Sequence, residues 1–565
     1  MSEHPPAMQR GIRGFGARLL AAMPVSFACA FTFALFGILD IYLHNTTSFP
    51  FHLDDILLPT LLETLGCFAV LALALSLLRG RLFDWGLSLA LSLLVAGYVQ
   101  GNFLNLPLGQ LTGEPIPWAE HAHHGTRNLL VWAAMLIVSC ALLQFWPRVR
   151  RFLCWFIPVL LVGMQLAGLV RPLRAGVPKA YGYLYTDGMF ELSARENILV
   201  LVLDRLDSVY VDTIRAEEPD FFDALDGFTY FRNNISTDNR TFPAVATLLT
   251  GRTHAFDRAG EDYFTLAYGE SDFLPLLRQH NYTTKLYMSY GYTYSSMHQL
   301  ANLADNACDG AYDVQIRPVM ERMNKLSAFR YMPHAFKEAF WLSTSEFEHT
   351  VSVSEGKQPY VTDDYALYQE MLQQGLSVQD ARSNFIYLHL HGSHGPLNLN
   401  EHVERVTDQE TSYEQQAMGC LRIVFEYLER MKQLGLYEDA TILIMGDHGI
   451  STDRYPLDYA IRTALFVKPA GSAGTPLVMS NAPVSHSDFQ ATILRAAGIE
   501  NDAFGDATYF DIAEDAPRTR RIVYRSDDPD MPGRRLLESY DVTGDAEDFA
   551  NWHKVYEYEV PFPYM

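Results

Sequence analysis

The stretch "NILVLVLD" at residues 197–204 is a continuous apolar run that ends in a carboxylate. Four further runs have the same character: "TTKLYMS" (283–289), "NFIYLHLHG" (384–392), "TILIMGDHG" (441–449) and "TALFVKP" (463–469). Helical stretches such as "SYEQQAMGCLRIVFEYLERMKQLG" lie between them. Because buried apolar strands alternate with helices, we expect an α/β domain with a mostly parallel central sheet flanked by helices.

Polar residues gather at or just after the ends of these predicted strands. Functional groups in such sheets lie at the carboxyl ends of strands, so these side chains are expected to share one site. Carboxylate oxygens and imidazole nitrogens are ligands that zinc or manganese accepts. The residues concerned are Asp204, His389, His391, His394, Asp447 and His448.

The first third of the chain has a different composition. Five apolar segments, at about 19–43, 55–78, 85–107, 129–146 and 152–172, are each near the length that a helix needs to cross a bilayer. Basic residues precede the first segment and follow the second and fourth, whereas the alternate loops are nearly free of Lys and Arg. The positive-inside rule therefore predicts a cytoplasmic N-terminus and an extracytoplasmic domain after the fifth span. The basic residues are Arg10, Arg13, Arg18, Arg79, Arg81, Arg148, Arg150 and Arg151.

These patterns divide the 565 residues into four parts. We expect a transmembrane domain at 1–174, an interfacial linker at 175–195, a catalytic domain at 196–516, and antiparallel strands at 517–565 appended to the main sheet. The net charge of −23 disfavours nucleic acid as a partner.

Four polar or thiol side chains allow two interpretations each. Asp40 and Glu63 lie in or near the ends of spans, where they could pair with a neighbouring helix or line a recess for a lipid head group. Cys308 and Cys420 lie outside the apolar third and could form a disulfide if that part is extracytoplasmic, or remain free.

The stretch "DNRTFPAVATLLTG" (238–251) places Thr241 just before a helix that begins near Pro243. Thr241 could simply cap this helix. Alternatively, it could be a nucleophile, because the amino end of a helix attracts phosphate. A threonine hydroxyl becomes a usable nucleophile when a bound cation lowers its pKa.

Together, "NILVLVLD", "RTFPAVATLLTGR", "HLHGSHGP", "IMGDHG" and "VSHSDFQATILRAAGI" resemble, in this order, the motifs of the alkaline phosphatase superfamily, sulfatase-like branch. Thr241 stands at the position of the sulfatase Cys or Ser, and Ala244-Val245 replace the Ser-Arg pair of sulfatases. Both differences favour phosphate over sulfate esters. The spans followed by this domain resemble lipoteichoic acid synthases and phosphoethanolamine transferases.

The resemblance implies roles for particular residues. One divalent cation, zinc or manganese, would be bound by Asp204, Thr241, Asp447 and His448, and Leu390 stands where two-zinc phosphatases have an aspartate. Catalytic roles are implied for Thr241, His394 and His486. His389, His391 and Asn239 are candidates for substrate binding, although the two histidines could equally be structural.

The hypothesis that follows is a membrane-anchored transferase on the outer face of a bacterial membrane. It would move phosphoethanolamine or phosphoglycerol from a phospholipid to a glycan or lipid acceptor through a phosphothreonine. One alternative is a phosphodiesterase or sulfatase with water as acceptor. Another is a non-catalytic member of the fold.

Overall fold

The computed structural model describes residues 7–559 apart from 47–48, 107, 109–115, 117, 120, 176–182, 254–259, 290–302, 309–311, 344–345, 348–349, 354–356, 408, 451–461 and 528–534. The chain forms two compact units. Unit 1 comprises Met1–Lys179 and Val314–Val351, and unit 2 comprises Ala180–Asp313 and Ser352–Met565.

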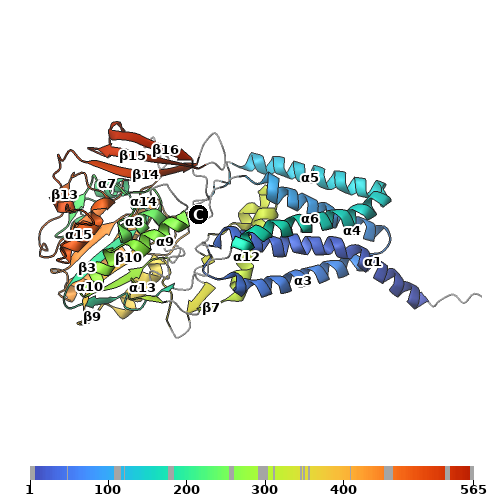
Figure 1. Ribbon diagram of the computed structural model, residues 1–565, viewed down its shortest axis with the longest axis horizontal. Helices are drawn as coiled ribbons and strands as arrows, with labels where there is room; N and C mark the ends of the chain where they lie inside the picture. The colour runs from blue at the N-terminus through green and yellow to red at the C-terminus, as the bar shows by residue number, and fades with distance from the viewer. Residues whose placement is uncertain are drawn as a thin grey trace, which may run out of the picture. The chain divides into compact units, whose positions relative to one another are not determined.

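Unit 1 contains long apolar helices that lie alongside one another (Figure 1). Five helical stretches are long and apolar enough to cross a membrane: Gly14–His44, Leu53–Leu77, Arg81–Leu104, Ala122–Phe145 and Pro147–Arg174. The five predicted segments are therefore confirmed. The elements are α1 (Ala7–Ala30), π-helix η1 (Phe31–Phe36), α2 (Gly37–His44), α3 (Leu53–Leu77), α4 (Arg81–Val99), π-helix η3 (Gln100–Leu104), α5 (Ala122–Phe145) and α6 (Pro147–Ala175).

A segment from the middle of the sequence also belongs to unit 1. It holds α12 (Ile316–Tyr331) and the 3₁₀ helix η7 (His334–Phe340), between the short strands β7 (Tyr312–Val314) and β8 (Val351–Val353). Asp40 pairs with Arg330 of α12 at 2.5 Å, and Glu63 accepts a hydrogen bond from Asn324 at 2.7 Å. The two intramembrane acids therefore have partners, which the inserted segment supplies.

The core of unit 2 is a seven-stranded sheet in the order β13-β4-β12-β11-β3-β10-β5. Only β12 runs against the direction of the others, so the sheet is mostly parallel as predicted. The strands are β3 (Asn197–Leu203), β4 (Thr229–Phe231), β5 (Tyr282–Tyr287), β10 (Ser383–Leu390), β11 (Thr441–Met445), β12 (Leu465–Lys468) and β13 (Val478–Ser480).

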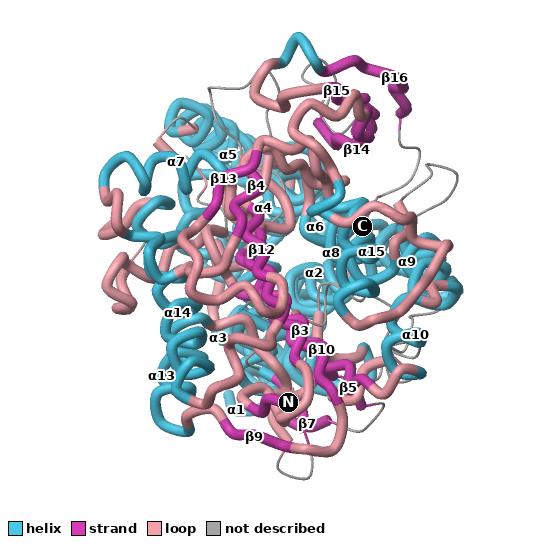
Figure 2. The backbone as a smooth tube through the Cα atoms, turned by 90° about the vertical axis from the view of Figure 1, so that its left-hand side faces the viewer, coloured by secondary structure: helices cyan, strands magenta, loops and turns pink. Residues whose placement is uncertain are grey.

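Helices cover both faces of this sheet (Figure 2). On one face lie α7 (Ser208–Glu217), α13 (Asp364–Gln374) and α14 (Tyr413–Gln433). On the other lie α8 (Thr241–Thr250), α9 (Gly260–Glu270), α10 (Phe273–Gln279) and α15 (Phe489–Ala496). Successive residues of β3 alternate between the two cores, Leu199, Leu201 and Leu203 in one and Ile198, Val200 and Val202 in the other. This explains why β3 reads as a continuous apolar run.

The C-terminal strands are antiparallel, but they form their own sheet in the order β14-β15-β16. The prediction that they extend the main sheet is therefore wrong. Ile522, Tyr524 and Val542 instead form a separate small core with Ile235. The strands are β14 (Thr519–Asp527), β15 (Arg535–Thr543) and β16 (Trp552–Glu559).

Short elements complete unit 2. β1 (Tyr183–Leu184) pairs with β6 (Ala307–Cys308), and β2 (Glu191–Ser193) pairs with β9 (Ser377–Gln379). The described part of the predicted linker thus carries two short strands. The remaining 3₁₀ turns are η4 (Phe221–Ala224), η9 (His486–Asp488), η10 (Tyr509–Asp511) and η11 (Phe549–Asn551).

Cys420 is a free thiol. Its Sγ lies 3.1 Å from a carboxylate oxygen of Asp364 and 3.2 Å from the Gly392 carbonyl. The Cys420 thiol is buried and contacts these two oxygens, and it is not part of a disulfide. The Cys308–Cys420 disulfide is therefore not formed. The side chain of Cys308 lies outside the described part of the chain.

Gly392 tests how tightly the strand ends pack. A Cβ at this position would lie 2.4 Å from the Asp204 nitrogen and 2.5 Å from its carbonyl oxygen, and φ is +61°. We expect Gly392→Ala to lower the free energy of unfolding by roughly 3 kcal/mol or more, because backbone atoms cannot move aside. Gly435→Ala is the matched control, since Gly435 has φ +72° with nothing within 4 Å of a Cβ.

The control should cost only about 1 kcal/mol, from backbone strain alone. Denaturation of both purified variants in detergent, followed by circular dichroism, measures the difference. Equal losses at the two positions would contradict the close packing of residue 392 on Asp204.

Candidate active site and metal centre

Three neighbouring strands bring the central residues together. Asp204 directly follows β3, His389 lies near the end of β10, and Asp447 follows β11. Since β10 and β11 are the two neighbours of β3, their carboxyl ends meet at one edge of the sheet. All three side chains are buried.

These three residues can each offer one ligand atom within 4.8 Å of the others. The Nε2 atom of His448 faces the same group, 3.6 Å from Asp204 Oδ1 and 3.8 Å from Asp447 Oδ2. His448 Nδ1 lies 2.8 Å from the Gly449 carbonyl, so in the neutral ring the proton belongs on Nδ1. Nε2 is then a lone pair directed toward two carboxylates, an arrangement that a divalent cation satisfies.

The charge states suit a cation. Burial lowers the pKa of His448 to about 4, so the ring is neutral near pH 7. For Asp447, burial raises the pKa, but the neighbouring His448 and His389 outweigh this and hold it below its usual range. The Arg205 and His448 backbone N–H groups also donate to Asp447 Oδ1, at 3.0 and 2.9 Å. The Asp447 carboxylate therefore faces a neutral His448 ring.

Thr241 is the first residue of α8, and Arg240 occupies the N-cap position without a side-chain cap bond. The Thr241 hydroxyl lies 3.1 Å from His448 Nε2 and 3.4 Å from Asp204 Oδ2. It is directed at the carboxylate and histidine group instead of capping its own helix. The interpretation of Thr241 as a helix cap alone is therefore wrong.

The other predicted residues lie at different distances from this group. The His394 ring borders it: burial and then the charge of Arg205 lower its pKa, and Nδ1 lies 2.5 Å from the Gly395 carbonyl. His486 is fully buried, with Nε2 3.4 Å from the Thr463 hydroxyl, and burial lowers its pKa to about 4. His391 Nε2 lies 3.1 Å from the Pro396 carbonyl, and Asn239 is buried two residues before Thr241. The roles of these four residues stay predictions.

The structure gives one predicted residue a different candidate role and adds one residue to the site. His389, expected to bind substrate or to be structural, belongs to the candidate metal-ligand group. Its place near the end of β10 was the available signal. Arg205 has a left-handed backbone with φ of 60°, and its guanidinium lies 5.6 Å from the centroid of the Tyr413 ring. Its charge also acts on His394 and His448, and no motif in the sequence pointed to it.

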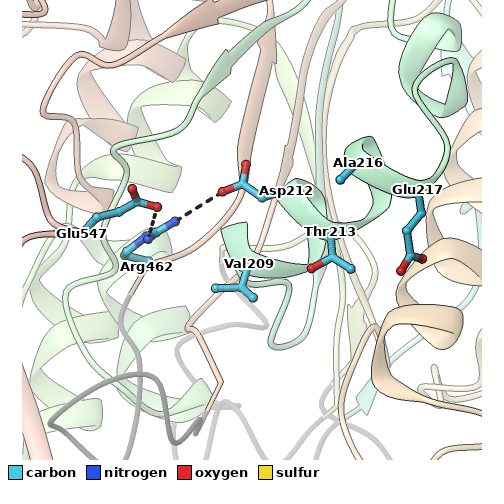
Figure 3. A pocket seen from close by; sticks show the side chains of 7 residues that line it. All are labelled: Val209, Asp212, Thr213, Ala216, Glu217, Arg462 and Glu547. Carbon is cyan, nitrogen blue, oxygen red and sulfur yellow. Dashed lines mark hydrogen bonds and ion pairs between the residues drawn. The ribbon is translucent and has the colours of Figure 1, made fainter.

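A separate hollow of about 560 Å³ lies beside the buried Arg462 (Figure 3). Arg462 contacts Glu547 at 2.5 Å and Asp212 at 3.9 Å across it. None of the predicted catalytic or metal-binding residues lines this hollow, so it is distinct from the strand-end group. The lining residues are Val209, Asp212, Thr213, Ala216, Glu217, Arg462 and Glu547.

Metal content gives a direct test of this geometry. The purified full chain is expected to hold about one divalent metal ion per molecule. Asp447→Asn should lose nearly all of this metal, because it replaces an anionic carboxylate ligand with a neutral amide. His389→Ala should also lower occupancy if His389 is a ligand. Elemental mass spectrometry measures this, with the exposed His402→Ala as the control. Undiminished metal in Asp447→Asn would exclude this centre.

Comparisons with solved structures find distant similarities. A lipoteichoic acid synthase, LtaP from Listeria monocytogenes, is 12% identical, with a TM-score of 0.34 over 64% of this chain and 86% of that one. The phosphonate monoester hydrolase SpPMH from Silicibacter pomeroyi is 14% identical, with a TM-score of 0.37 over 65% and 89%. The sulfatase PsFucS1 from Pseudoalteromonas is 12% identical, with a TM-score of 0.35 over 64% and 81%. Among curated proteins, none is similar enough in sequence to count as a match.

A family model gives the assignment. The model described as sulfatase matches residues 196–499, more than half of the chain, and it includes every strand of the central sheet and every residue of the strand-end group. The expected relation to the sulfatase-like branch of the alkaline phosphatase superfamily is thus confirmed, and the chain belongs to the sulfatase family.

Proposed function

We propose that the protein is a membrane-anchored, metal-dependent phosphotransferase. It moves phosphoethanolamine or phosphoglycerol from a phospholipid to a glycan or lipid acceptor on the outer face of the membrane. The observation that carries the proposal is the Thr241 hydroxyl, 3.1 Å from His448 and 3.4 Å from Asp204, in a chain that begins with five apolar spans. The spans keep the enzyme in the bilayer that holds its donor.

Two features favour phosphate over sulfate. Sulfate-ester hydrolysis in relatives uses a modified Cys or Ser, whereas this chain has Thr241. The Ser-Arg pair of sulfatases is replaced by Ala244-Val245, and both of these side chains are fully buried. Neither can contact a substrate, so the positive charge of the sulfatase arginine is missing here.

Two half-reactions balance the chemistry. First, Thr241 Oγ1 bonds to phosphorus, the bond from phosphorus to the diacylglycerol oxygen breaks, and the proton of Thr241 ends on diacylglycerol. Second, the acceptor hydroxyl attacks phosphorus, the bond to Thr241 breaks, and the acceptor's proton restores the threonine hydroxyl. A divalent cation, when bound, lowers the pKa of the Thr241 hydroxyl and offsets the charge on the phosphoryl oxygens.

The chain's own groups support these steps. α8 directs its positive end toward Thr241, which stabilises negative charge on the phosphoryl group. His394 Nδ1 lies 2.5 Å from the Gly395 carbonyl, which favours the ring proton on Nδ1, and Nε2 is then the basic nitrogen that would take the proton of the acceptor hydroxyl. Arg205 places a fixed positive charge beside His394 and His448, suited to phosphoryl oxygens.

Thr241 itself gives the sharpest test. Thr241→Ala should lower transfer by about 10³-fold or more, because the attacking oxygen is gone, whereas Thr241→Ser should retain measurable activity. Mass spectrometry of lipids and glycans, in membranes with each variant, follows diacylglycerol formation and acceptor modification. The intact mass of the wild-type chain should show an intermediate that carries the phospho-alcohol on Thr241, and the Ala variant should not. Full transfer by Thr241→Ala would refute the mechanism.

The same experiment separates transfer from hydrolysis. Transfer modifies an acceptor and leaves little free phospho-alcohol, whereas hydrolysis releases phosphoethanolamine or glycerol phosphate to water. Release of free product without a modified acceptor would assign the protein to the hydrolases.

A further inference from the structure

The inserted segment at residues 316–340, formed by α12 and η7, contacts unit 1 at one end of the helix bundle. Its main contacts are with α2, α3, η1, η3 and α5, in the halves of the spans that end at His44 and Leu104 or begin at Leu53 and Ala122, and these four span ends lie on the same side. The charge of the loops predicts that this is the outer side. The insert is therefore expected at the outer surface of the membrane.

Polar contacts fix the insert to three spans. Arg330 pairs with Asp40, and its carbonyl accepts a hydrogen bond from Asn105 at 3.1 Å. The Ser327 hydroxyl donates to the Phe33 carbonyl at 2.5 Å. The His334 backbone N–H donates to Asn128 Oδ1 at 2.9 Å. Buried polar contacts of this kind set the position of a helix against transmembrane partners.

Small residues on the spans let α12 approach closely. A Cβ on Gly37 would lie 2.3 Å from the Ser327 hydroxyl, and one on Gly101 would lie 2.5 Å from the Tyr331 ring. Tyr331 also packs edge-on against Phe33, with ring centroids 5.2 Å apart. The insert is packed directly on the transmembrane helices, as small residues permit.

The depth of these contacts follows from helix geometry. Glu63 lies ten residues after Leu53, about 15 Å along the helix, and the 25-residue span exceeds a 30 Å hydrocarbon core by only about 7 Å. Asn324, bonded to Glu63, is thus at or below the outer boundary of the hydrocarbon. Asn128 lies six residues, about 9 Å, after Ala122 in a 24-residue span, which places η7 at the same boundary.

The exposed side of η7 and of Met332 just before it is mostly apolar. Met332 is 41% exposed and Phe336 is 53% exposed, and Ala335 and Ala339 are exposed between and beyond them. Lys337, in contrast, is almost fully buried, where its ammonium group bonds to the Phe329 carbonyl. The charged member of η7 on the surface is Glu338, which can stay in the head-group layer.

We propose that the stripe Met332, Ala335, Phe336 and Ala339 enters the outer leaflet and contacts phospholipid just below the head groups. The occupant is lipid because the same insert is fixed to spans at the depth of the hydrocarbon boundary. A helix with an apolar side at this depth lies in the interface and does not cross it. The catalytic chain therefore has a second membrane contact, separate from the five spans.

Fluorescence quenching tests the depth without any reference to activity. An environment-sensitive fluorescent amino acid is placed at position 336 of the full chain in lipid nanodiscs. Phospholipid brominated high on its acyl chains should quench it, and aqueous iodide should not. The matched control is position 510, a phenylalanine of unit 2 with 46% exposure, where iodide should quench and brominated lipid should not. Iodide quenching at 336 equal to that at 510 would overturn the proposal.

A second experiment, which rests on the proposed function, asks what the contact does. Met332→Asp with Phe336→Asp should lower transfer from a bilayer phospholipid at least about tenfold, and cleavage of soluble bis(4-nitrophenyl) phosphate should stay within about twofold. Equal losses with both substrates, or no loss with either, would contradict a role in lipid access. Quenching by lipid in a chain without transferase activity would overturn the proposed function and leave the insertion standing.

Discussion

Two buried carboxylates, Asp204 and Asp447, impose the constraint on which the site of unit 2 depends. Ionised carboxylates without compensating charge are costly inside a protein, and this pair faces the His448 ring, whose pKa burial lowers to about 4. A bound cation would offset these charges, and the surrounding backbone holds the two carboxylates in place. Gly392 and Gly446 press against the backbone of Asp204 and Leu206, where a Cβ would lie 2.4 Å from main-chain atoms. The loops after β10 and β11 thus pack tightly on the loop after β3.

This constraint explains why much of unit 2 could be predicted from sequence. Strands β3, β10 and β11 are buried on both faces, so their apolar runs are unambiguous, and a polar residue at the end of such a run stands out. Asp204, Asp447 and His448 were found in this way, and Thr241 was found from its place before the Pro243 helix; the structure places the four within contact distance. His389 was undervalued because it alternates with leucines inside β10, where a core histidine gives the same pattern. Arg205 could not be predicted as a site residue, because its position depends on a left-handed backbone conformation, and an arginine in the sequence does not indicate one.

The inserted segment shows a different limit. "IRPVMERMNKLSAFRY" (316–331) reads as an ordinary amphipathic helix, too short and too charged for a span. Nothing local says that its buried side meets transmembrane helices instead of the sheet. Asp40 and Glu63 indicated that some polar segment contacts the spans, since an acid near the end of a span requires a partner. Their partners, Arg330 and Asn324, could not be identified from the sequence, because each lies more than 250 residues away from the acid that it contacts.

The number of covalent connections between the two units affects how far unit 2 can move from the membrane spans. The chain passes from one unit to the other after residues 179, 313 and 351, so three covalent connections join them. A domain on a single flexible linker samples a large volume, and the effective concentration of a bound partner falls as that volume grows. Two further connections through a segment fixed to the spans by Arg330 and Ser327 reduce the volume that unit 2 can explore. For the proposed phospholipid donor, which stays in the bilayer, this restriction would be useful, because its head group lies at one height above the membrane.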